Sequence, residues 1–454
     1  MKYFNPILLF FICSFSMGQE QTIEPNPTHN IDGTELVNLM NQNVPKRMEE
    51  LTIPGGVITI VYRDSIIYNQ GFGFSNLTSE EKVDPDDTVF RVASLSKIVT
   101  TVAALQLVEQ GKLALEVDIN DYLDDVQLAN DYNTNVTLHQ LLTHTAGFDQ
   151  NNMARRSLKQ ERVPSLKKYL SQHLPGISRR PGEVISYSNH GMALAGYLVE
   201  KTSGQQFSPY VRDHIFTPLG MFNSSFENPS AYGERLAKGY RKTNQVTTFE
   251  YLKTGPASML MTTGKDMSAF MRMLLNEGSY KNTKILDKAL ISRMVSTAFR
   301  NHEFAEGRGL GFSVYDTSPK LVYHNGSFRG FNSSFYLYPE IKLGIFFSFN
   351  HKNGGMLTRE IMASAHENIL QLEDQPIGSM EVINTSEDFS PYIGRYQHVK
   401  NSWDNLEKLE NFPSSGLRVN LSGNKGISIL NEPFFPIGNS GFINNDGGRV
   451  FFKD

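Results

Sequence analysis

The feature that most constrains the fold is the placement of strand-like segments at two distant parts of the chain. Residues 55–75 contain two strand-like, β-branched stretches joined at Arg63-Asp64-Ser65, which indicates a hairpin. Residues 320–350 contain a second β region, with strands expected at Leu321–His324, Phe331–Tyr338 and Leu343–Phe349. The segments between are mostly helical, and two of them end at a glycine stop signal: Met192–Thr202 and Lys265–Asn276. Strands from both ends of one domain, with helices in the middle, predict an α+β fold with a helical insert.

The sequence changes character from about Ser386 onward. Short strand-like pieces there alternate with Gly, Asn, Ser and Pro: Leu417–Leu421, Ile427–Leu430 and Val450–Phe452. This pattern predicts a small all-β module over residues 386–454. It would follow a main domain over residues 19–375, which closes with a helix near Thr358–Leu372.

The first residues match a secretory signal peptide. Lys2 precedes an apolar stretch from Ile7 to Phe15, and the small residues of Ser16-Met17-Gly18 suit cleavage after Gly18. One alternative is a membrane anchor, but the stretch is shorter than the roughly 20 residues of a spanning helix. A lipoprotein modified at Cys13 is another, although Ile12 stands where a small residue is needed. We expect removal of residues 1–18, no stable membrane span afterwards, and export of bacterial type to the periplasm or medium.

Cysteine usage and charge argue against several classes of function. Cys13 is the only cysteine, so a mature chain would have no disulfide, no thiol nucleophile and no cysteine-ligated zinc. A net charge of −4 without a basic run argues against a nucleic-acid partner. Neither a His-Glu-x-x-His motif nor a phosphate-binding Gly-x4-Gly-Lys-[Ser/Thr] loop occurs. We therefore expect no metal and no other cofactor.

Ser94 and Lys97 form a Ser-x-x-Lys pair in a setting that the other such pairs lack. The chain contains four: Ser79/Lys82, Ser94/Lys97, Ser165/Lys168 and Ser422/Lys425. Only Ser94 follows a strand-like segment, Thr88–Val92, and opens a long apolar helix that stops at Gly111. Residues three apart share one face of a helix, so Lys97 can lie beside the Ser94 hydroxyl.

Lys97 gains nothing from its local position. The first turn of a helix carries partial positive charge and favours acidic residues, and the apolar neighbours of Lys97 imply burial. Both conditions lower the pKa of a lysine, and a neutral amine can take the proton of a serine. The alternative is that Ser94 caps the helix and Lys97 extends to water.

Five segments in a fixed order resemble the serine β-lactamase-related family, which includes class C β-lactamases, penicillin-binding carboxypeptidases, D-amino-acid peptidases and β-lactamase-like esterases. The matching segments are FRVASLSK, LLTHTAGF, the YSN of residues 187–189, PASMLMTTGKDMSAFMRMLL and HNGSFRGF. The resemblance spans about residues 35–370. It implies a β-lactamase/transpeptidase-like fold, with an antiparallel sheet, flanking helices and a helical subdomain.

The resemblance also implies roles for individual residues. Ser94 would be the acylated nucleophile and Lys97 its general base, while Tyr187 would carry the proton to the leaving group, alone or with Lys97. Asn189 would hydrogen-bond the acyl side chain of the substrate. The backbone N–H groups of Ser94 and Ser327 would form the oxyanion hole. His144, within LLTHTAGF, is expected to be structural rather than catalytic.

The third motif departs from the penicillin-binding pattern. Where those proteins carry Lys-Thr-Gly, this chain has His324-Asn325-Gly326, so the lysine that helps to hold a substrate carboxylate is missing. A histidine with a pKa near 6.5 is mostly neutral at pH 7. If His324 replaces that lysine, lowering the pH through its titration should improve the binding of carboxylate-bearing substrates.

The sequence thus predicts an exported serine hydrolase that acts through an acyl-enzyme on a small ester, amide or D-amino-acid peptide. Alternatives are a β-lactamase or penicillin-binding carboxypeptidase, and a sensor or binding protein that is acylated without turnover. The oligomeric state stays open.

Overall fold

The structure is a computed structural model. It describes residues 31 and 33–374, apart from positions 127, 129, 228, 243–244 and 304. Beyond these it describes residues 389, 393–396, 417–422, 426–429, 432–438, 441–443 and 449–451. The expected signal peptide lies outside the described residues.

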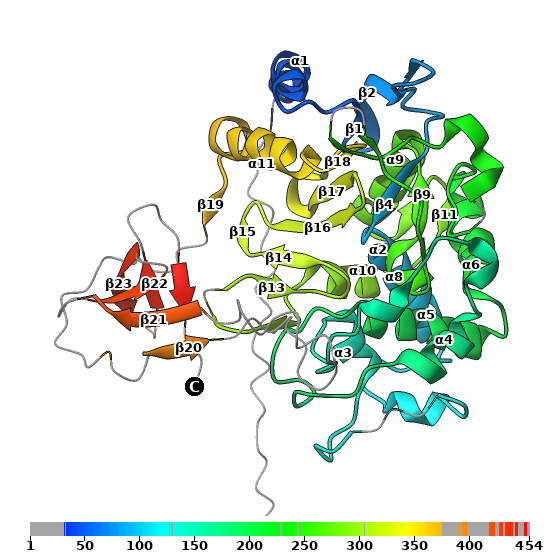
Figure 1. Cartoon of the computed structure of the whole chain (residues 1–454), viewed down its shortest axis with the longest axis vertical. Coiled ribbons are helices and arrows are strands. Elements are labelled where there is room, and N and C mark those ends of the chain that lie inside the picture. The colour runs from blue at the N-terminus through cyan, green and yellow to red at the C-terminus, as the bar shows by residue number, and fades with distance from the viewer. Residues whose placement is uncertain are drawn as a thin grey trace, which may run out of the picture. The chain divides into compact units, whose positions relative to one another are not determined.

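An antiparallel sheet of nine strands forms the centre of the main part of the described chain (Figure 1). Its strands, in spatial order, are β12 (Phe299–Arg300), β13 (Gly307–Arg308), β14 (Ser313–Tyr315), β16 (Leu321–Phe328), β17 (Phe331–Tyr338), β18 (Leu343–Phe349), β1 (Gly55–Tyr62), β2 (Ser65–Asn76) and β3 (Glu81–Lys82). β1 pairs with β18 through residues 56–62 and 343–349, so the two predicted β regions meet at the middle of one sheet. The prediction of a sheet built from both ends of the domain is confirmed.

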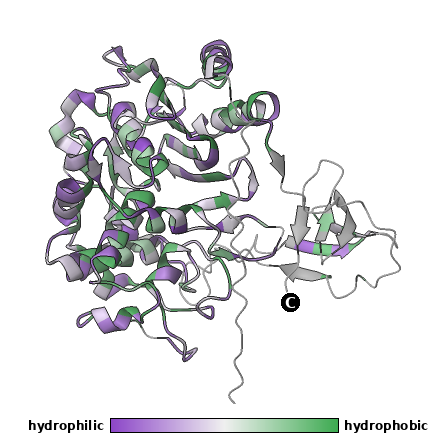
Figure 2. Cartoon of the chain, turned by 180° about the vertical axis from the view of Figure 1, so that it is seen from behind, coloured by the Kyte–Doolittle hydropathy of each residue, from purple (hydrophilic) through white to green (hydrophobic). Residues whose placement is uncertain are grey.

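The central strands are apolar along almost their whole length because both of their faces are covered. All residues of β18 are buried, as are all of β1 except Tyr62. One face packs against α1 (Gly33–Glu50) and α11 (Gly354–Ala365), and α9 (Gly264–Leu275) covers the other. Figure 2 shows the matching pattern in the helices, which carry both hydrophobic and hydrophilic stretches.

Helix α2 (Ser96–Glu109) lies between the sheet and a group of helices that forms the helical subdomain. Every residue of α2 from Ser96 to Leu107 is buried, which explains its apolar sequence. Its main neighbours are α5 and α8. The other helices of the described residues are α3 (Leu138–Leu142), α4 (Leu166–His173), α5 (Asn189–Ser203), α6 (Phe207–Val211), α7 (Thr217–Leu219), α8 (Gly255–Ser258) and α10 (Lys288–Val295).

Short strand pairs complete the main part of the chain. They are β4 (Phe90–Ala93) with β9 (Leu260–Thr262), β5 (Arg156–Ser157) with β8 (Tyr251–Leu252), β6 (Tyr240–Lys242) with β7 (Gln245–Val246), β10 (Ser279–Tyr280) with β11 (Thr283–Lys284), and β15 (Thr317–Ser318) with β19 (Glu373–Asp374).

A second sheet of six strands contains β20 (Gly394–Tyr396), β21 (Leu417–Leu421), β22 (Ile427–Ile429), β23 (Glu432–Gly438), β24 (Gly441–Ile443) and β25 (Arg449–Phe451). The small C-terminal all-β module of the predicted fold is thus present.

Three predicted boundaries need correction. The strand expected at Leu321–His324 continues to Phe328, because its polar Asn-Gly-Ser stretch stays paired with β17 up to the contact between Phe328 and Phe331. The helix expected to begin at Ser94 begins at Ser96, so Ser94 itself lies in the preceding turn. The closing helix begins four residues earlier than Thr358, at Gly354, and changes after Ala365 to a π-helical turn over residues 366–370.

Candidate active site

Ser94 lies in a tight turn between β4 and α2. Ala93, the residue before it, has a φ of 48°, a left-handed conformation that is unusual for a residue with a Cβ atom. The hydroxyl of Ser96 stabilises this turn by donating to the carbonyl of Ala93 and accepting from the N–H of Leu260. The turn is thereby joined to β9, and the Ser94 side chain stays partly exposed.

The side chain of Lys97 is completely buried beside Ser94. Its Nζ lies 3.1 Å from Oγ of Ser94, 2.9 Å from Oδ1 of Asn189 and 2.8 Å from the carbonyl oxygen of Ala257 in α8. The alternative that Lys97 extends to water is therefore wrong. Two of its three partners are carbonyl oxygens, which can only accept, and the third is a hydroxyl that can also donate. A neutral amine, with two protons and one lone pair, matches this set of partners.

The start of α5 brings Tyr187 and Asn189 to the same point. Ser188 caps this helix through its Oγ, which accepts from the N–H of Gly191 at 3.0 Å. Oη of Tyr187 donates to Oγ of Ser94 at 2.9 Å. The Ser94 hydroxyl thus lies between a phenol and an amine, and both come from elements that are fixed by packing.

His144 contacts the segment that carries Tyr187 and the Tyr187 ring itself. Its carbonyl accepts from the N–H of Ser186 at 2.7 Å, and its Nδ1 accepts from the N–H of Ser188 at 3.3 Å. Its ring lies 4.4 Å from the ring of Tyr187, centroid to centroid. These contacts agree with the predicted structural role of His144.

The protonation states of the amine and the phenol differ from those of exposed groups. Burial, with a further contribution from the positive charge of Arg155, places the pKa of Lys97 well below its ordinary value of 10.5. Burial raises the pKa of Tyr187 to about 12. At neutral pH Tyr187 therefore keeps its proton and Lys97 is the group able to accept one.

The backbone of β16 passes directly beside Ser94. A Cβ atom at Gly326 would lie 2.1 Å from the carbonyl oxygen of Val92 and 3.2 Å from the backbone nitrogen of Ser94. Only glycine permits this approach. It brings the next amide, that of Ser327, into the neighbourhood of the Ser94 amide, while the Ser327 side chain itself is exposed.

His324 is buried on the same strand, with its ring centroid 6.5 Å from that of Tyr187. Its Nδ1 lies 2.8 Å from the carbonyl oxygen of Asn325. Burial is the main cause that lowers the pKa of His324 to about 3, followed by the electrostatic effects of Lys97, when it is protonated, and of Arg308. The lowered pKa favours a neutral imidazole near pH 7 and argues against titration near pH 6.5, while a role of His324 in binding carboxylates stays a prediction.

A family model for beta-lactamases matches residues 40–366 of this chain. The chain belongs to the beta-lactamase family. The matched region contains all the residues described above, and members of this family are generally serine hydrolases.

Related sequences are distant. The chain is 26% identical over 324 residues to Protein flp of Staphylococcus aureus, an alignment that covers 69% of this chain and 63% of that protein. It is 26% identical over 362 residues to Beta-lactamase-like protein 2 of Dictyostelium discoideum, covering 75% of this chain and 64% of the relative. The chain thus spans less than two thirds of the length of these curated relatives.

Solved structures confirm the predicted beta-lactamase/transpeptidase-like fold. An octameric penicillin-binding protein homologue from Pyrococcus abyssi superposes with a TM-score of 0.62 at 21% identity, covering 92% of this chain and 96% of that one. A beta-lactamase/D-alanine carboxypeptidase from Pseudomonas syringae gives a TM-score of 0.61 at 19% identity, covering 73% and 99%. A class C beta-lactamase from Rhodobacter sphaeroides gives 0.58 at 20% identity, covering 72% and 98%.

The beta-lactamase-type site contains three residues that sequence reasoning missed. Ser96 stabilises the turn, Ala257 supplies an acceptor for Lys97, and the charge of Arg155 acts on Lys97 and Tyr187. Ala257 belongs to the PASM segment, which contributed to the family resemblance. Its role depends on its backbone carbonyl, however, and every residue has one, so the residue type gives no sign of that role. Arg155 lies outside the five matching segments, seven residues after the end of LLTHTAGF.

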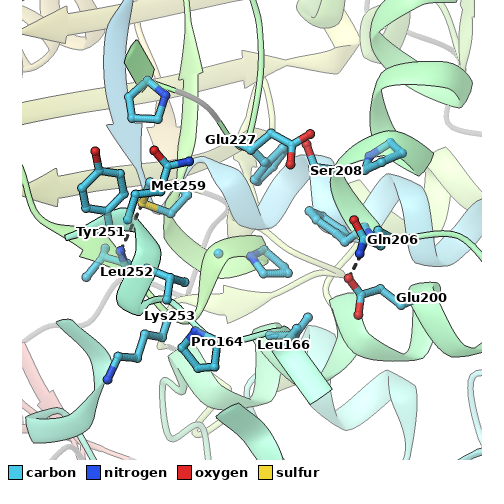
Figure 3. A pocket seen from close by; sticks show the side chains of 18 residues that line it. Pro164, Leu166, Glu200, Gln206, Ser208, Glu227, Tyr251, Leu252, Lys253 and Met259 are labelled. Atoms are coloured by element: carbon cyan, nitrogen blue, oxygen red, sulfur yellow. Dashed lines mark hydrogen bonds between the residues drawn. The ribbon is translucent and has the colours of Figure 1, made fainter. Parts of the chain in front are cut away.

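A cavity of about 330 Å³ is lined in part by Gly255 and Pro256 of α8 (Figure 3). Glu200, Tyr251 and Met259 are among the residues that line it, whereas Ser94, Lys97 and Tyr187 are not. Within the described ranges no group of three or more His, Cys, Asp or Glu side chains could hold a metal ion. In that same part of the chain, no helix has the length and apolar character needed to cross a membrane.

Proposed function

We propose that this protein is an exported serine hydrolase that forms an acyl-enzyme at Ser94. The observation that carries the proposal is the position of the Ser94 hydroxyl between Nζ of Lys97 at 3.1 Å and Oη of Tyr187 at 2.9 Å. A serine in contact with a buried amine whose pKa lies well below its ordinary value is an activated nucleophile, because the neutral form of the amine is favoured. The other two contacts of the amine fix it in the geometry needed to accept a proton.

Acylation would begin with attack of the Ser94 oxygen on the carbonyl carbon of an ester or amide. The serine proton passes to the neutral amine of Lys97 as the new C–O bond forms. The negative charge that develops on the carbonyl oxygen is stabilised by the backbone N–H groups of Ser94 and Ser327.

Collapse of the tetrahedral intermediate breaks the bond to the leaving group. Because the pKa of Tyr187 is raised to about 12, its phenol is a proton donor at neutral pH rather than a base. Tyr187 gives its proton to the leaving oxygen or nitrogen and regains one from the Lys97 ammonium. Water then attacks the acyl-enzyme with Lys97 again as base, which releases the acid and restores Ser94.

The proposed substrates are small esters, amides or D-amino-acid peptides. Oδ1 of Asn189 accepts from Lys97, so its Nδ2 group would meet the acyl side chain of the substrate. His324 would contribute a neutral surface where a penicillin-binding protein has a lysine. We therefore expect neutral esters and amides to be better substrates than β-lactams or peptides with a free C-terminal carboxylate.

Labelling with a fluorophosphonate probe, followed by peptide mass mapping, tests the nucleophile. The probe should modify the peptide that contains Ser94, and Ser94→Ala should abolish both labelling and hydrolysis of a p-nitrophenyl ester. Labelling that persists in Ser94→Ala would overturn the proposal. Burst kinetics test turnover: one equivalent of product without a steady state would identify an acylated sensor instead.

Export and domain division belong to the same proposal. Residues 1–18 would be the signal peptide, residues 19–375 the hydrolase domain and residues 386–454 a separate β-rich module. N-terminal sequencing of the protein from the periplasm of an expressing bacterium should begin at Gln19. A chain that remains in the cytoplasm with Met1 would exclude export.

A further inference from the structure

Two arginines face one buried carboxylate near the end of β16, and a third arginine binds the backbone of the same residue. The side chain of Glu250 is 11% exposed, and its Oε1 pairs with Arg329 at 2.9 Å. Its Oε2 lies 3.9 Å from Nε of Arg156, beyond hydrogen-bond distance, and its carbonyl accepts from Nη2 of Arg91 at 2.8 Å. Two guanidinium groups thus face the Glu250 carboxylate and a third binds the backbone carbonyl of the same residue, and these four side chains carry two positive charges in excess.

The three arginines are not equivalent. Arg91 is buried, with its guanidinium 4.0 Å from the ring centroid of Phe249 and 5.0 Å from that of Phe328. The side chain of Arg156 is 46% exposed and has no hydrogen bond within the described residues beyond its long approach to Glu250. Arg329 is 35% exposed. Arg91 is therefore structural, whereas Arg156 and Arg329 present charge to solvent.

This cluster lies next to the turn that holds Ser94. Arg91 is on β4, three residues before Ser94, and Gly326 of β16 packs against Val92 and Ser94. Phe328 follows Gly326 by two residues, or about 7 Å along the strand. Nη2 of Arg91 also lies 3.6 Å from the sulfur of Met259, one residue beyond α8. Figure 3 shows Met259 and Tyr251 on the same wall of the neighbouring cavity.

The direction of β16 decides which part of a substrate the cluster would meet. His324 stands where the family places the lysine for a leaving-group carboxylate, and Phe328 lies about 13 Å further along the strand. Ser327, the proposed oxyanion donor, lies between them. The arginines are therefore beyond the end of β16 that is opposite to His324, on the side where the proposed mechanism would place the acyl group of the substrate.

The two ends of β16 also differ in charge. At the leaving-group end His324 is neutral, and Arg308 is paired with Glu306 at 3.3 Å. At the acyl end Arg156 and Arg329 share a single carboxylate. The excess positive charge is thus on the side opposite to the position of the missing lysine.

We propose that Arg156 and Arg329 form a subsite for a carboxylate on the acyl group of the substrate, so that the enzyme prefers half-esters or half-amides of dicarboxylic acids. This inference rests on the proposed function of Ser94. A carboxylate placed beside Phe328 would receive charge-assisted hydrogen bonds from both guanidinium groups.

Two matched esters test the subsite: mono-p-nitrophenyl glutarate and p-nitrophenyl glutaramate, which replaces the carboxylate by a carboxamide of the same shape. The ratio of their kcat/KM values should favour the glutarate by on the order of tenfold, as expected for a charged hydrogen bond. The ratio should fall towards one in Arg156→Gln and Arg329→Gln and recover in Arg156→Lys. Arg212→Gln, which removes an exposed arginine paired with Asp213, should leave the ratio unchanged.

A binding measurement separates failure of this subsite from failure of the hydrolase proposal. Glutarate should raise the thermal unfolding midpoint of Ser94→Ala more than glutaramide does, and Arg156→Gln in that background should remove the difference. Equal shifts by the two ligands, or a kcat/KM ratio near one in an active wild-type enzyme, would overturn the subsite. Loss of turnover with a persisting glutarate shift would overturn only the hydrolase.

Discussion

Substitution of Lys97 by methionine tests whether this buried amine is neutral in the folded protein. Methionine keeps most of the volume of the side chain but can neither donate to the carbonyl oxygens of Asn189 and Ala257 nor accept the Ser94 proton. Acylation should therefore fall by a factor of about 10² to 10⁴, the usual contribution of a general base. Loss of activity alone does not reveal the charge of the lysine, whereas the pH dependence of stability does.

The magnitude follows from proton linkage. The pKa of Lys97 is far below 10.5 in the folded state and returns to its ordinary value on unfolding. Between the native pKa and 10.5 the unfolded chain therefore binds one more proton than the native chain, and stability rises with pH by about 1.4 kcal/mol per unit. Methionine removes this dependence. It also leaves two buried acceptors without a donor, at a pH-independent cost of about 1–3 kcal/mol each.

The two effects oppose each other at pH 7, so the slope is the decisive quantity. Denaturant unfolding followed by circular dichroism at pH 7, 8 and 9 gives the difference in unfolding free energy between wild type and Lys97→Met. That difference should move in favour of wild type as the pH rises from 7 to 9, by up to about 1.4 kcal/mol per pH unit. Lys112→Met, with an exposed side chain in both states, is the matched control and should follow wild type. A difference that stays constant would mean that native Lys97 is an ammonium, and the role of Lys97 as base would fail.

Two further predictions concern β16. Gly326→Ala would place a Cβ atom 2.1 Å from the carbonyl oxygen of Val92 and displace the strand, so single-turnover acylation should fall by about 10² or more. Gly176→Ala is the control, because the space around Gly176 is open. Acylation at the wild-type rate in Gly326→Ala would contradict the close packing. The native pKa of His324, about 3, lies below that of the unfolded chain, so its contribution to stability is lost as the pH falls from 6.5 towards 3. His324→Gln should then be more resistant to acid than wild type, by about 2 kcal/mol at pH 5 in denaturant unfolding, and an unchanged acid sensitivity would refute the neutral, buried imidazole.

The parts of the site that could be predicted from sequence depend on local spacing. Ser94 and Lys97 are three residues apart at the start of a helix, and this spacing alone brings an amine beside a hydroxyl. Asn189 begins a helix, Ser188 caps it, and Tyr187 lies directly before this cap. In each case the relevant geometry lies within one element and its boundary.

The parts that could not be predicted depend on contacts between distant segments. The carbonyl of Ala257 meets Lys97 across 160 positions of sequence, and Arg91 meets Glu250 across 159. The lowered pKa of His324 could not be predicted for the same reason. Whether a histidine keeps its ordinary pKa depends on its burial and on the charges beside it, and here both come from other segments of the chain.

The fold also explains why the base of this site is a lysine within an apolar helix. Because α2 lies between the sheet and the helical subdomain, its second residue, Lys97, is buried. Burial disfavours the charged ammonium, so a lysine at this position tends to lose its proton. The packing that destabilises an ammonium at this position therefore also favours the neutral amine beside Ser94. A substitution that loosens the packing around α2 without touching Ser94 should therefore raise the pKa of Lys97 and weaken acylation. Stability of this helix and reactivity of the serine would then change together.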